Sequence, residues 1–265
     1  MKSVFELPPT VMDLIEDSII TIPTSLADTM QEITRPYTES VEPFRELLRP
    51  ILEMAESLAE AQRPFKAMRM LGEVQYVYWD YLMPEFVDSI ISAKSPRGIN
   101  KFLLEWNKAD GYRTLGHTNH LCSLYLHNKP YERLFIQSIA AFHNRNNELA
   151  VVGFIVIVDG LLADISGKDT TNWGKRIEAL IEKCDSLDED DAVLFILLST
   201  LEGALEVLRA DSRNFKNEPQ NLNRHLIMHG RSRRIKRRLD CIKLINIIYG
   251  LLLTNDYIEQ DADVS

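Results

Sequence analysis

The residues best suited to chemistry lie in the stretch NRHLIMHG, which runs from Asn223 to Gly230. Asn223 is a good N-cap for a helix that begins at Arg224, and Gly230 is expected to end that helix. His225 and His229 are four residues apart and should share one helix face. Arg224 and His229 should lie about 140° apart around the helix, at roughly 100° per residue. One short helical turn is therefore predicted to present a guanidinium and an imidazole together.

Three kinds of site could use these residues. The spacing of His225 and His229 suits zinc, but Leu226 stands where a zinc protease has glutamate, and no third ligand is nearby. The arginine and histidines could instead serve a structural role by bonding carbonyl groups across a helical bundle. A phosphodiester site is the third interpretation, because arginine offers a planar fork to phosphate oxygens and histidine exchanges protons near neutral pH.

The spacing of Arg224, one polar residue, three further residues and His229 resembles the signature motif of the HEPN superfamily. The asparagine before it and the glycine after it are similar to HEPN-type domains of prokaryotic defence and abortive-infection proteins. The helix expected at 149–164, LAVVGFIVIVDGLLAD, contains the pair Asp159-Gly160 and is similar to the segment that often precedes the motif. The resemblance covers residues 131–265.

The resemblance implies a small helical bundle that forms a homodimer and acts as a metal-independent endoribonuclease, without a cofactor, in a toxin or phage-defence role. His229 would activate the RNA 2′-hydroxyl or protonate the leaving 5′-oxygen, and Arg224 would hold the phosphate. His225 would orient the pair, with Asn223 and Asp159 in support. The products would be a 2′,3′-cyclic phosphate and a 5′-hydroxyl. An antitoxin or another protein partner would also be expected.

A basic run follows the motif directly. The sequence RSRRIKRR holds six positive charges in eight residues, although the whole chain has a net charge of −9. Such a run could attract the RNA backbone to the neighbouring site without reading its sequence. It could equally be a solvated face or a strip that binds a partner. The candidate RNA-binding residues are Arg231, Arg233, Arg234, Lys236, Arg237 and Arg238.

The composition points to an all-α protein of the cytoplasm. The chain has 265 residues, of which 45% are hydrophobic and 26% charged, and apolar residues recur mostly at helical spacing. Its three cysteines, at 122, 184 and 241, fit neither a zinc site nor a disulfide framework, which favours a reducing compartment. The apolar runs 150–163 and 192–208 are shorter than the roughly 20 residues of a membrane helix and each contains an acid, so buried helices and no membrane association are expected.

We predict an N-terminal helical region of unknown role at 1–130 and a HEPN-like helical bundle at 131–265, with the boundary near 127–132. An apolar face at helical spacing runs from 41 to 61. The helix expected from 131 to 165 should break near 143–147, and Thr171 or Asn172 should cap the next one. Acids at 188–191 should open a further helix.

Two other stretches carry noteworthy side chains. Residues 72–93 hold four aromatic rings close together, which could form a base-stacking platform or a packed contact between helices. Residues 110–120, with two histidines, are predicted to be a loop, and Trp79, Trp106 and Trp173 are expected in the core.

Two alternatives to the nuclease remain open at this point. The helical bundle could be catalytically silent and bind RNA, a nucleotide or a partner protein. The chain could also lack any role with nucleic acid, in which case residues 231–238 would dock an acidic partner.

Overall fold

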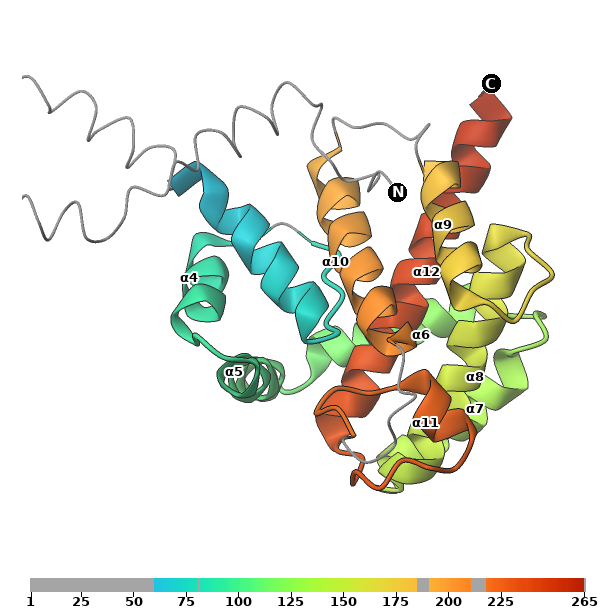
Figure 1. The fold of residues 1–265 in the computed structure, drawn as a ribbon, viewed down its shortest axis with the longest axis horizontal. Coiled ribbons are helices and arrows are strands. Elements are labelled where there is room, and N and C mark those ends of the chain that lie inside the picture. The colour runs from blue at the N-terminus through green and yellow to red at the C-terminus, as the bar shows by residue number, and fades with distance from the viewer. Residues whose placement is uncertain (1–59, 81, 185–190, 211–217, 265) are drawn as a thin grey trace, which may run out of the picture. The chain divides into compact units, whose positions relative to one another are not determined.

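The computed structural model describes residues 60–80, 82–184, 191–210 and 218–264, and the described part of the chain is helical with no β-strand. The prediction of an all-α fold is confirmed. The first helix of the described residues covers 60–73 (Figure 1). It is followed by α4 (Pro84–Ser92), α5 (Pro96–Ala109), α6 (Arg113–Tyr125), α7 (Glu132–His143), α8 (Asn147–Ser166), α9 (Trp173–Cys184), α10 (Ala192–Arg209), α11 (Arg224–Met228) and α12 (Arg238–Val264).

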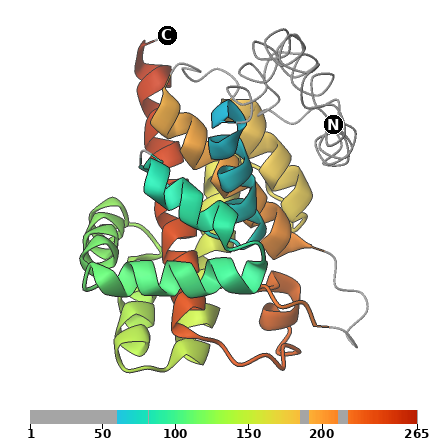
Figure 2. The ribbon, with the colours of Figure 1, turned by 90° about the vertical axis from the view of Figure 1, so that its left-hand side faces the viewer.

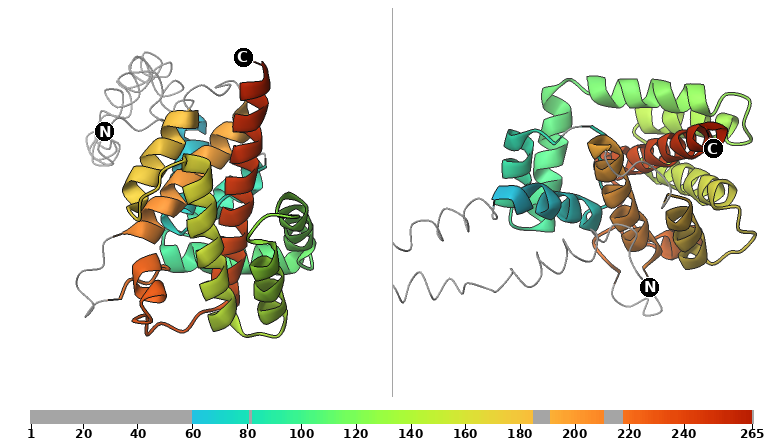
Figure 3. Two further views of the ribbon diagram at one scale, coloured as in Figure 1. Left: turned by 90° about the vertical axis from the view of Figure 1, so that its right-hand side faces the viewer. Right: turned by 90° about the horizontal axis from the view of Figure 1, so that it is seen from above.

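Helix α12 is the centre of the helical bundle (Figure 2). It packs most extensively on α8 and also contacts α6 and α10. Its residues 241–250 are all buried, and most of them are apolar, as expected of a helix that is covered by neighbours on every side. The two views of Figure 3 show the helix running through the bundle between these elements.

Helices α7 and α8 form an antiparallel pair at the point where the sequence predicts a break. Helix α7 ends at His143, Arg145 adopts a φ of +61°, and the side chain of Asn146 accepts a hydrogen bond from the amide of Leu149 to cap α8. Helices α8 and α12 are both long and apolar enough to cross a membrane by length and composition. However, 61% and 72% of their most apolar windows are buried against other helices of the chain.

The helix at 60–73 approaches α10 closely through a pair of glycines. A Cβ on Gly72 would lie 3.0 Å from the Cα of Gly203, and the reverse holds for Gly203. Any larger side chain at either position would push the two backbones apart. This close approach fixes the segment that follows residue 73 against α10.

The chain divides into two units, residues 1–63 and residues 64–265. The boundary expected near 127–132 therefore lies inside the second unit. The physical reason is that α12 packs on α5 and α6, which precede that boundary, as well as on α8. The apolar face expected from 41 to 61 lies almost entirely outside the described residues, and so do the acids at 188–190.

The loop predicted at 110–120 is mostly helical, so that prediction is wrong. Helix α6 begins at Arg113. In its first turn, the backbone amide of Thr114 donates a hydrogen bond to Asp110 Oδ2 at 3.0 Å. Leu115, Thr118 and Cys122 are its buried residues. The glycine and polar residues between them face solvent, and they gave the stretch the composition of a loop, so the helical spacing of the buried residues was not recognised.

Candidate functional site

The motif forms the short helix α11. Asn223 is its N-cap, and the Asn223 side chain accepts a hydrogen bond from the amide of Leu226 at 3.0 Å. His229 is the C-cap, and Gly230 leaves the helix with a φ of +63°, a conformation that glycine adopts without strain. The predicted start and end of this helix are confirmed.

The residues just before α11 are held by two distant parts of the chain. The buried side chain of Gln75 pairs with the backbone of Leu222, donating to its carbonyl at 2.7 Å and accepting from its amide at 2.8 Å. Asn223 donates from Nδ2 to the carbonyl of Ala210, at the end of α10, at 2.7 Å. The motif is therefore fixed in position although it lies between two non-helical segments.

Asp159 on α8 holds Arg224 in place. Its Oδ1 accepts a hydrogen bond from Arg224 Nη2 at 3.0 Å and another from Arg176 Nη1 at 3.2 Å, and it also accepts from the indole of Trp173. The Arg224 guanidinium lies over the Trp173 ring, 5.0 Å from its centroid. The contact between Asp159 and Arg224 that the sequence suggested is thus present, with Trp173 and Arg176 as further members.

A pocket of about 210 Å³ opens beside Arg224. Two guanidinium groups, those of Arg209 and Arg224, and the imidazole of His225 line it, together with the start of α9. The side chain of Asn172 caps α9 by accepting a hydrogen bond from the amide of Gly174 at 2.9 Å. Asn172 is one of the two residues predicted to cap this helix. The positive end of the α9 dipole therefore lies beside three side chains, those of Arg209, Arg224 and His225, whose chemistry suits an anion. The lining residues are Thr171, Asn172, Trp173, Gly174, Arg209, Ala210, Arg224 and His225.

Arg209 fits into this wall because its neighbour is a glycine. A Cβ on Gly174 would lie 3.1 Å from Arg209 Nη1. Glu206 binds the same guanidinium through Nη2 at 2.6 Å and through Nε at 2.8 Å, and this hydrogen bonding raises the pKa of Arg209. Arg209 therefore stays positively charged, and Glu206 holds its guanidinium in place through Nε and Nη2.

The two histidines of the motif are exposed and touch one another. Their ring centroids are 4.5 Å apart, with the planes at 64°, as their shared helix face predicts. His225 lines the pocket, while His229 lies against the ring of His225 and is not among the lining residues. The structure therefore brings an arginine and both imidazoles to one short surface.

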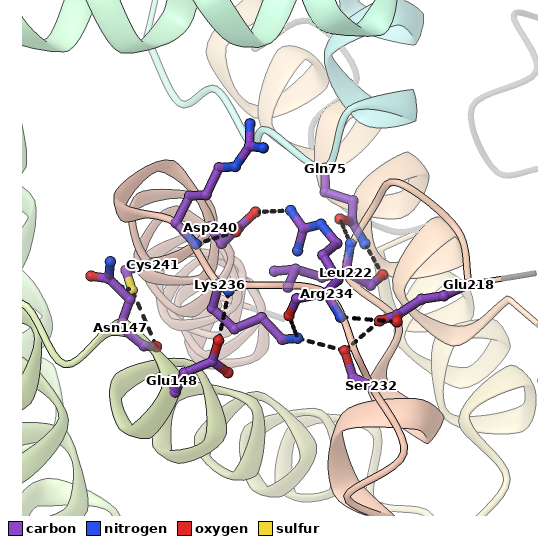
Figure 4. A network of polar contacts seen from close by, with 11 residues as sticks. Gln75, Asn147, Glu148, Glu218, Leu222, Ser232, Arg234, Lys236, Asp240 and Cys241 are labelled. Atoms are coloured by element: carbon purple, nitrogen blue, oxygen red, sulfur yellow. Dashed lines mark hydrogen bonds and ion pairs between the residues drawn. The ribbon is translucent and has the colours of Figure 1, made fainter.

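The basic run forms a loop and the start of α12, and acidic residues anchor it (Figure 4). Glu218 accepts hydrogen bonds from the Ser232 hydroxyl and from the amides of Arg233, at 2.7 Å, and Arg234, at 3.0 Å. Glu148, on α8, accepts from the amide of Lys236 at 2.8 Å. The loop has a defined path because its backbone donors end on these carboxylates.

Three of the six basic side chains serve the fold. Lys236 is 5% exposed, and desolvation lowers its pKa. Arg234 pairs with Asp240 at 2.5 Å, and Arg238 lies over the rings of Tyr112 and Phe142. These three side chains are engaged within the fold, so the candidates for RNA binding reduce to the three basic residues that are exposed. They are Arg231, Arg233 and Arg237.

Among the described residues, no group of three or more histidine, cysteine, aspartate or glutamate side chains is placed to hold a metal ion. The other four histidines lie far from the motif in the sequence. His117 and His120 are on α6, His127 follows α6, and His143 ends α7. All three cysteines are buried.

Sequence reasoning missed two parts of the site. Trp173 was expected simply in the core, and it is 4% exposed, but its ring also supports Arg224. Arg209 was not considered, since nothing in its local sequence distinguishes it from other residues at the end of a helix. The capping residue Asn172 and the small Gly174 behind it were the available signals for the anion-binding start of α9.

Neither a protein-family model, nor a curated protein, nor a solved structure matches this chain.

Proposed function

We propose that this protein cleaves RNA as a metal-independent endoribonuclease of the HEPN type. The observation that carries the proposal is the open pocket in which Arg209, Arg224 and His225 meet the start of α9, with His229 against His225. Each of these groups suits a phosphodiester or a proton that moves during its cleavage. Arg224 is anchored by Asp159 and yet remains at the pocket surface, with 23% of its side chain exposed.

The proposed reaction is attack of the 2′-hydroxyl on the adjacent phosphorus. The bond from phosphorus to the 2′-oxygen forms as the bond to the 5′-oxygen breaks, which gives a 2′,3′-cyclic phosphate and a 5′-hydroxyl. Arg224, Arg209 and the α9 amides hold the phosphate and stabilise the charge that builds on its oxygens. The imidazoles of His225 and His229 remove the proton from the 2′-hydroxyl and return one to the 5′-oxygen.

The exposed arginines of the basic run extend the site for the RNA backbone. Arg231, Arg233 and Arg237 follow the motif on the anchored loop, where positive charge attracts phosphates at any sequence. Binding through them should weaken steeply as salt is raised.

We also propose that the protein acts as a homodimer in the cytoplasm, in a toxin or defence role and with an antitoxin or another protein partner. Apolar side chains beside the motif support a protein contact there. Met228 is 41% exposed, and Ile235, which lies between Arg234 and Lys236 in the sequence, is 78% exposed. Multi-angle light scattering of the purified chain measures whether a dimer forms.

Incubation of the purified protein with a panel of labelled RNAs in excess EDTA tests the nuclease proposal. Replacing His229 or His225 by alanine should lower the cleavage rate about 10²–10⁴-fold, the usual loss for a general acid or base. His117→Ala removes an exposed imidazole from α6 and is the matched control, which should cleave as the wild type does. Cleavage that is unchanged in both motif variants would refute the proposal.

A catalytically silent binding module is the second candidate. The observation in its favour is that Arg224 is already engaged by Asp159 and Trp173, as a structural arginine would be. RNA binding that survives His229→Ala, without any cleavage, would favour this function. Binding should then be lost when Arg231 and Arg233 are replaced by glutamine.

A further inference from the structure

A second pocket, of about 150 Å³, shares no lining residue with the pocket beside Arg224. Its wall comes from the segment 76–80, Met83, the end of α5, the first half of α6 and one residue of α12. For the aromatic stretch in this wall, the sequence left open a platform for bases or a packed contact between helices. A cavity of about 150 Å³ holds one ring of the size of benzene, and it lies well below the ~300–1,000 Å³ of pockets for drug-sized molecules.

The two carboxylates of the wall have partners within the chain, so neither needs a bound cation. Burial acts to raise the pKa of Asp110, but hydrogen bonds from Thr114 and from the Tyr112 amide outweigh it, so the pKa is lowered. The nearby charge of Arg113 acts in the same direction. Asp80 also has an interaction partner. The wall therefore suits a neutral ligand better than an ion.

Amide and hydroxyl groups form the buried floor of the pocket. Tyr76, Asn107 and Asn246 are 6%, 4% and 6% exposed. Asn107 Nδ2 donates to the Tyr76 hydroxyl at 3.3 Å and to the carbonyl of Leu103 at 2.8 Å, while its Oδ1 accepts no hydrogen bond from the described residues. Asn246 lies within hydrogen-bonding reach of the same hydroxyl. Since a side-chain amide can form about four hydrogen bonds, this floor keeps an acceptor and a donor for a ligand.

Aromatic rings form the sides of the pocket. Trp106 is 36% exposed although the sequence placed it in the core, and Tyr78 and Trp79 are half-buried. Phe86 meets Trp106 in a T-shaped contact with a centroid distance of 5.1 Å, and Tyr249 meets Trp79 in another at 5.0 Å. No described ring stacks face to face on either tryptophan. Indole faces in such a wall stack readily on flat rings, including nucleobases.

The wall is held in place by neighbouring helices. The Tyr78 amide donates to the Thr200 hydroxyl on α10 at 3.0 Å, and the Tyr78 carbonyl lies 3.2 Å from the same hydroxyl. Helix α12 approaches so closely that a Cβ on Gly250 would lie 3.0 Å from Val77 Cγ1. A preorganised wall lowers the entropy lost on binding.

We propose that this pocket binds one uracil-type pyrimidine ring, stacked on Trp106 and hydrogen-bonded along its edge to Asn107 and Asn246. The N3–H group of the ring donates to Asn107 Oδ1, and the neighbouring carbonyl accepts from Asn246 Nδ2. Such a ring is flat, neutral and of the size of benzene, whereas a purine has two fused rings and exceeds the volume. Two sources share this chemistry, a free nucleoside and a base of an RNA strand. The inference does not depend on the proposed RNA cleavage.

Uridine, 3-methyluridine and adenosine form a matched set of neutral probes with the same sugar. The methyl group removes the N3–H donor but keeps the flat ring, and adenosine carries the larger base. Titration of the full-length protein, followed by calorimetry and by tryptophan fluorescence, should show binding of uridine. The other two nucleosides should bind at least tenfold more weakly. No binding of uridine at about 10 mM, or equal binding of either other nucleoside, would overturn the proposal.

Variants locate the binding. Trp106→Leu removes the stacking ring and Asn246→Leu removes the amide at similar volume, so each should weaken uridine binding at least fivefold. Phe65→Leu removes a ring that is 41% exposed and lies outside the pocket, and this control should bind uridine as the wild type does. If Asn246→Leu fails to fold by circular dichroism, Trp106→Leu decides the matter, since its side chain is partly exposed. Unchanged binding in Trp106→Leu contradicts the assignment.

A 2′-O-methylated oligouridylate distinguishes the two sources of the ring, because it lacks the 2′-hydroxyl that the proposed cleavage requires. If it binds more tightly than uridine and loses at least fivefold in Trp106→Leu, the ligand is a base of RNA. If Trp106→Leu loses uridine but binds the oligonucleotide as the wild type does, the ligand is a free nucleoside. Absence of RNA cleavage by the wild type would alter neither result.

Discussion

Replacing Asp159 by alanine removes a carboxylate on which three side chains of the candidate site depend. Arg224 and Arg176 donate to it at 3.0 Å and 3.2 Å, and the Trp173 indole donates to the same oxygen. Arg176 has only 10% of its side chain exposed, so the substitution leaves a nearly buried cation without its carboxylate. We expect a loss of stability from the isolated charge and not only from the missing hydrogen bonds.

The magnitude follows from how far each partner is buried. Removing one member of a fully buried ion pair costs about 3–5 kcal/mol. The side chains of Asp159 and Arg224 are 29% and 23% exposed, so solvent screens part of that cost. The hydrogen bond from Arg176 Nη1 to the backbone carbonyl of Asp159, at 3.3 Å, also survives, since it does not use the carboxylate. We therefore expect Asp159→Ala to lower the free energy of unfolding by about 2–3 kcal/mol.

Urea denaturation followed by circular dichroism measures this loss, provided that the slope with denaturant is unchanged. Asp164→Ala is the matched control. It removes an exposed carboxylate from the same helix, which accepts one hydrogen bond from Tyr131 at 2.9 Å. That variant should lose well under half as much. If Asp159→Ala loses no more than Asp164→Ala, Asp159 does not anchor the two arginines as described.

Two further predictions concern other parts of the bundle. Desolvation and the neighbouring Glu206 raise the pKa of Glu202 to about 7, so the stability linked to this proton is present at acid pH and is lost as pH rises from about 4.5 to 7. The side chain of Glu202→Gln stays neutral. In urea titrations its free energy of unfolding should exceed that of the wild type by about 1 kcal/mol at pH 8, after allowance for solvent screening, and should equal it at pH 4. An equal gain at both pH values would contradict this. A Cβ on Gly160 would collide with the Tyr131 ring, so Gly160→Ala should lower the free energy of unfolding by about 1–3 kcal/mol. Gly116→Ala meets nothing within 4 Å on α6 and should raise it by up to about 1 kcal/mol, the difference in helix propensity; a stabilising Gly160→Ala would show that the ring moves away freely.

Local patterns in the sequence were enough for the helices of the motif region. Helical spacing gave the all-α class, and the polar stretch at 143–147 marked the break between α7 and α8. Asn223 and Gly230 bounded α11, and the spacing of two histidines placed their rings together. These features depend on hydrogen bonds and side-chain directions within a few residues, so the chain itself contains the information.

The same local patterns failed where the buried face was weak. Helix α6 buries only Leu115, Thr118 and Cys122, and glycine and histidine residues on its exposed side gave it the composition of a loop. The boundary expected near 127–132 lies inside the unit of residues 64–265, because α12 packs on helices that precede it as well as on helices that follow it.

Only the tertiary structure decided how the charges are used. The sequence shows which residues of 231–238 are basic, but not their partners. Arg234 pairs with Asp240, and Arg238 lies over the rings of Tyr112, just before α6, and Phe142 on α7. The backbone amide of Lys236 donates to Glu148 on α8. The pocket likewise joins Arg209, Arg224 and the start of α9, which are separated in the chain. Electrostatic partners are set by distance in space, and that distance is fixed only when α9 and α11 pack on α8 and α10 packs on α9 and α11.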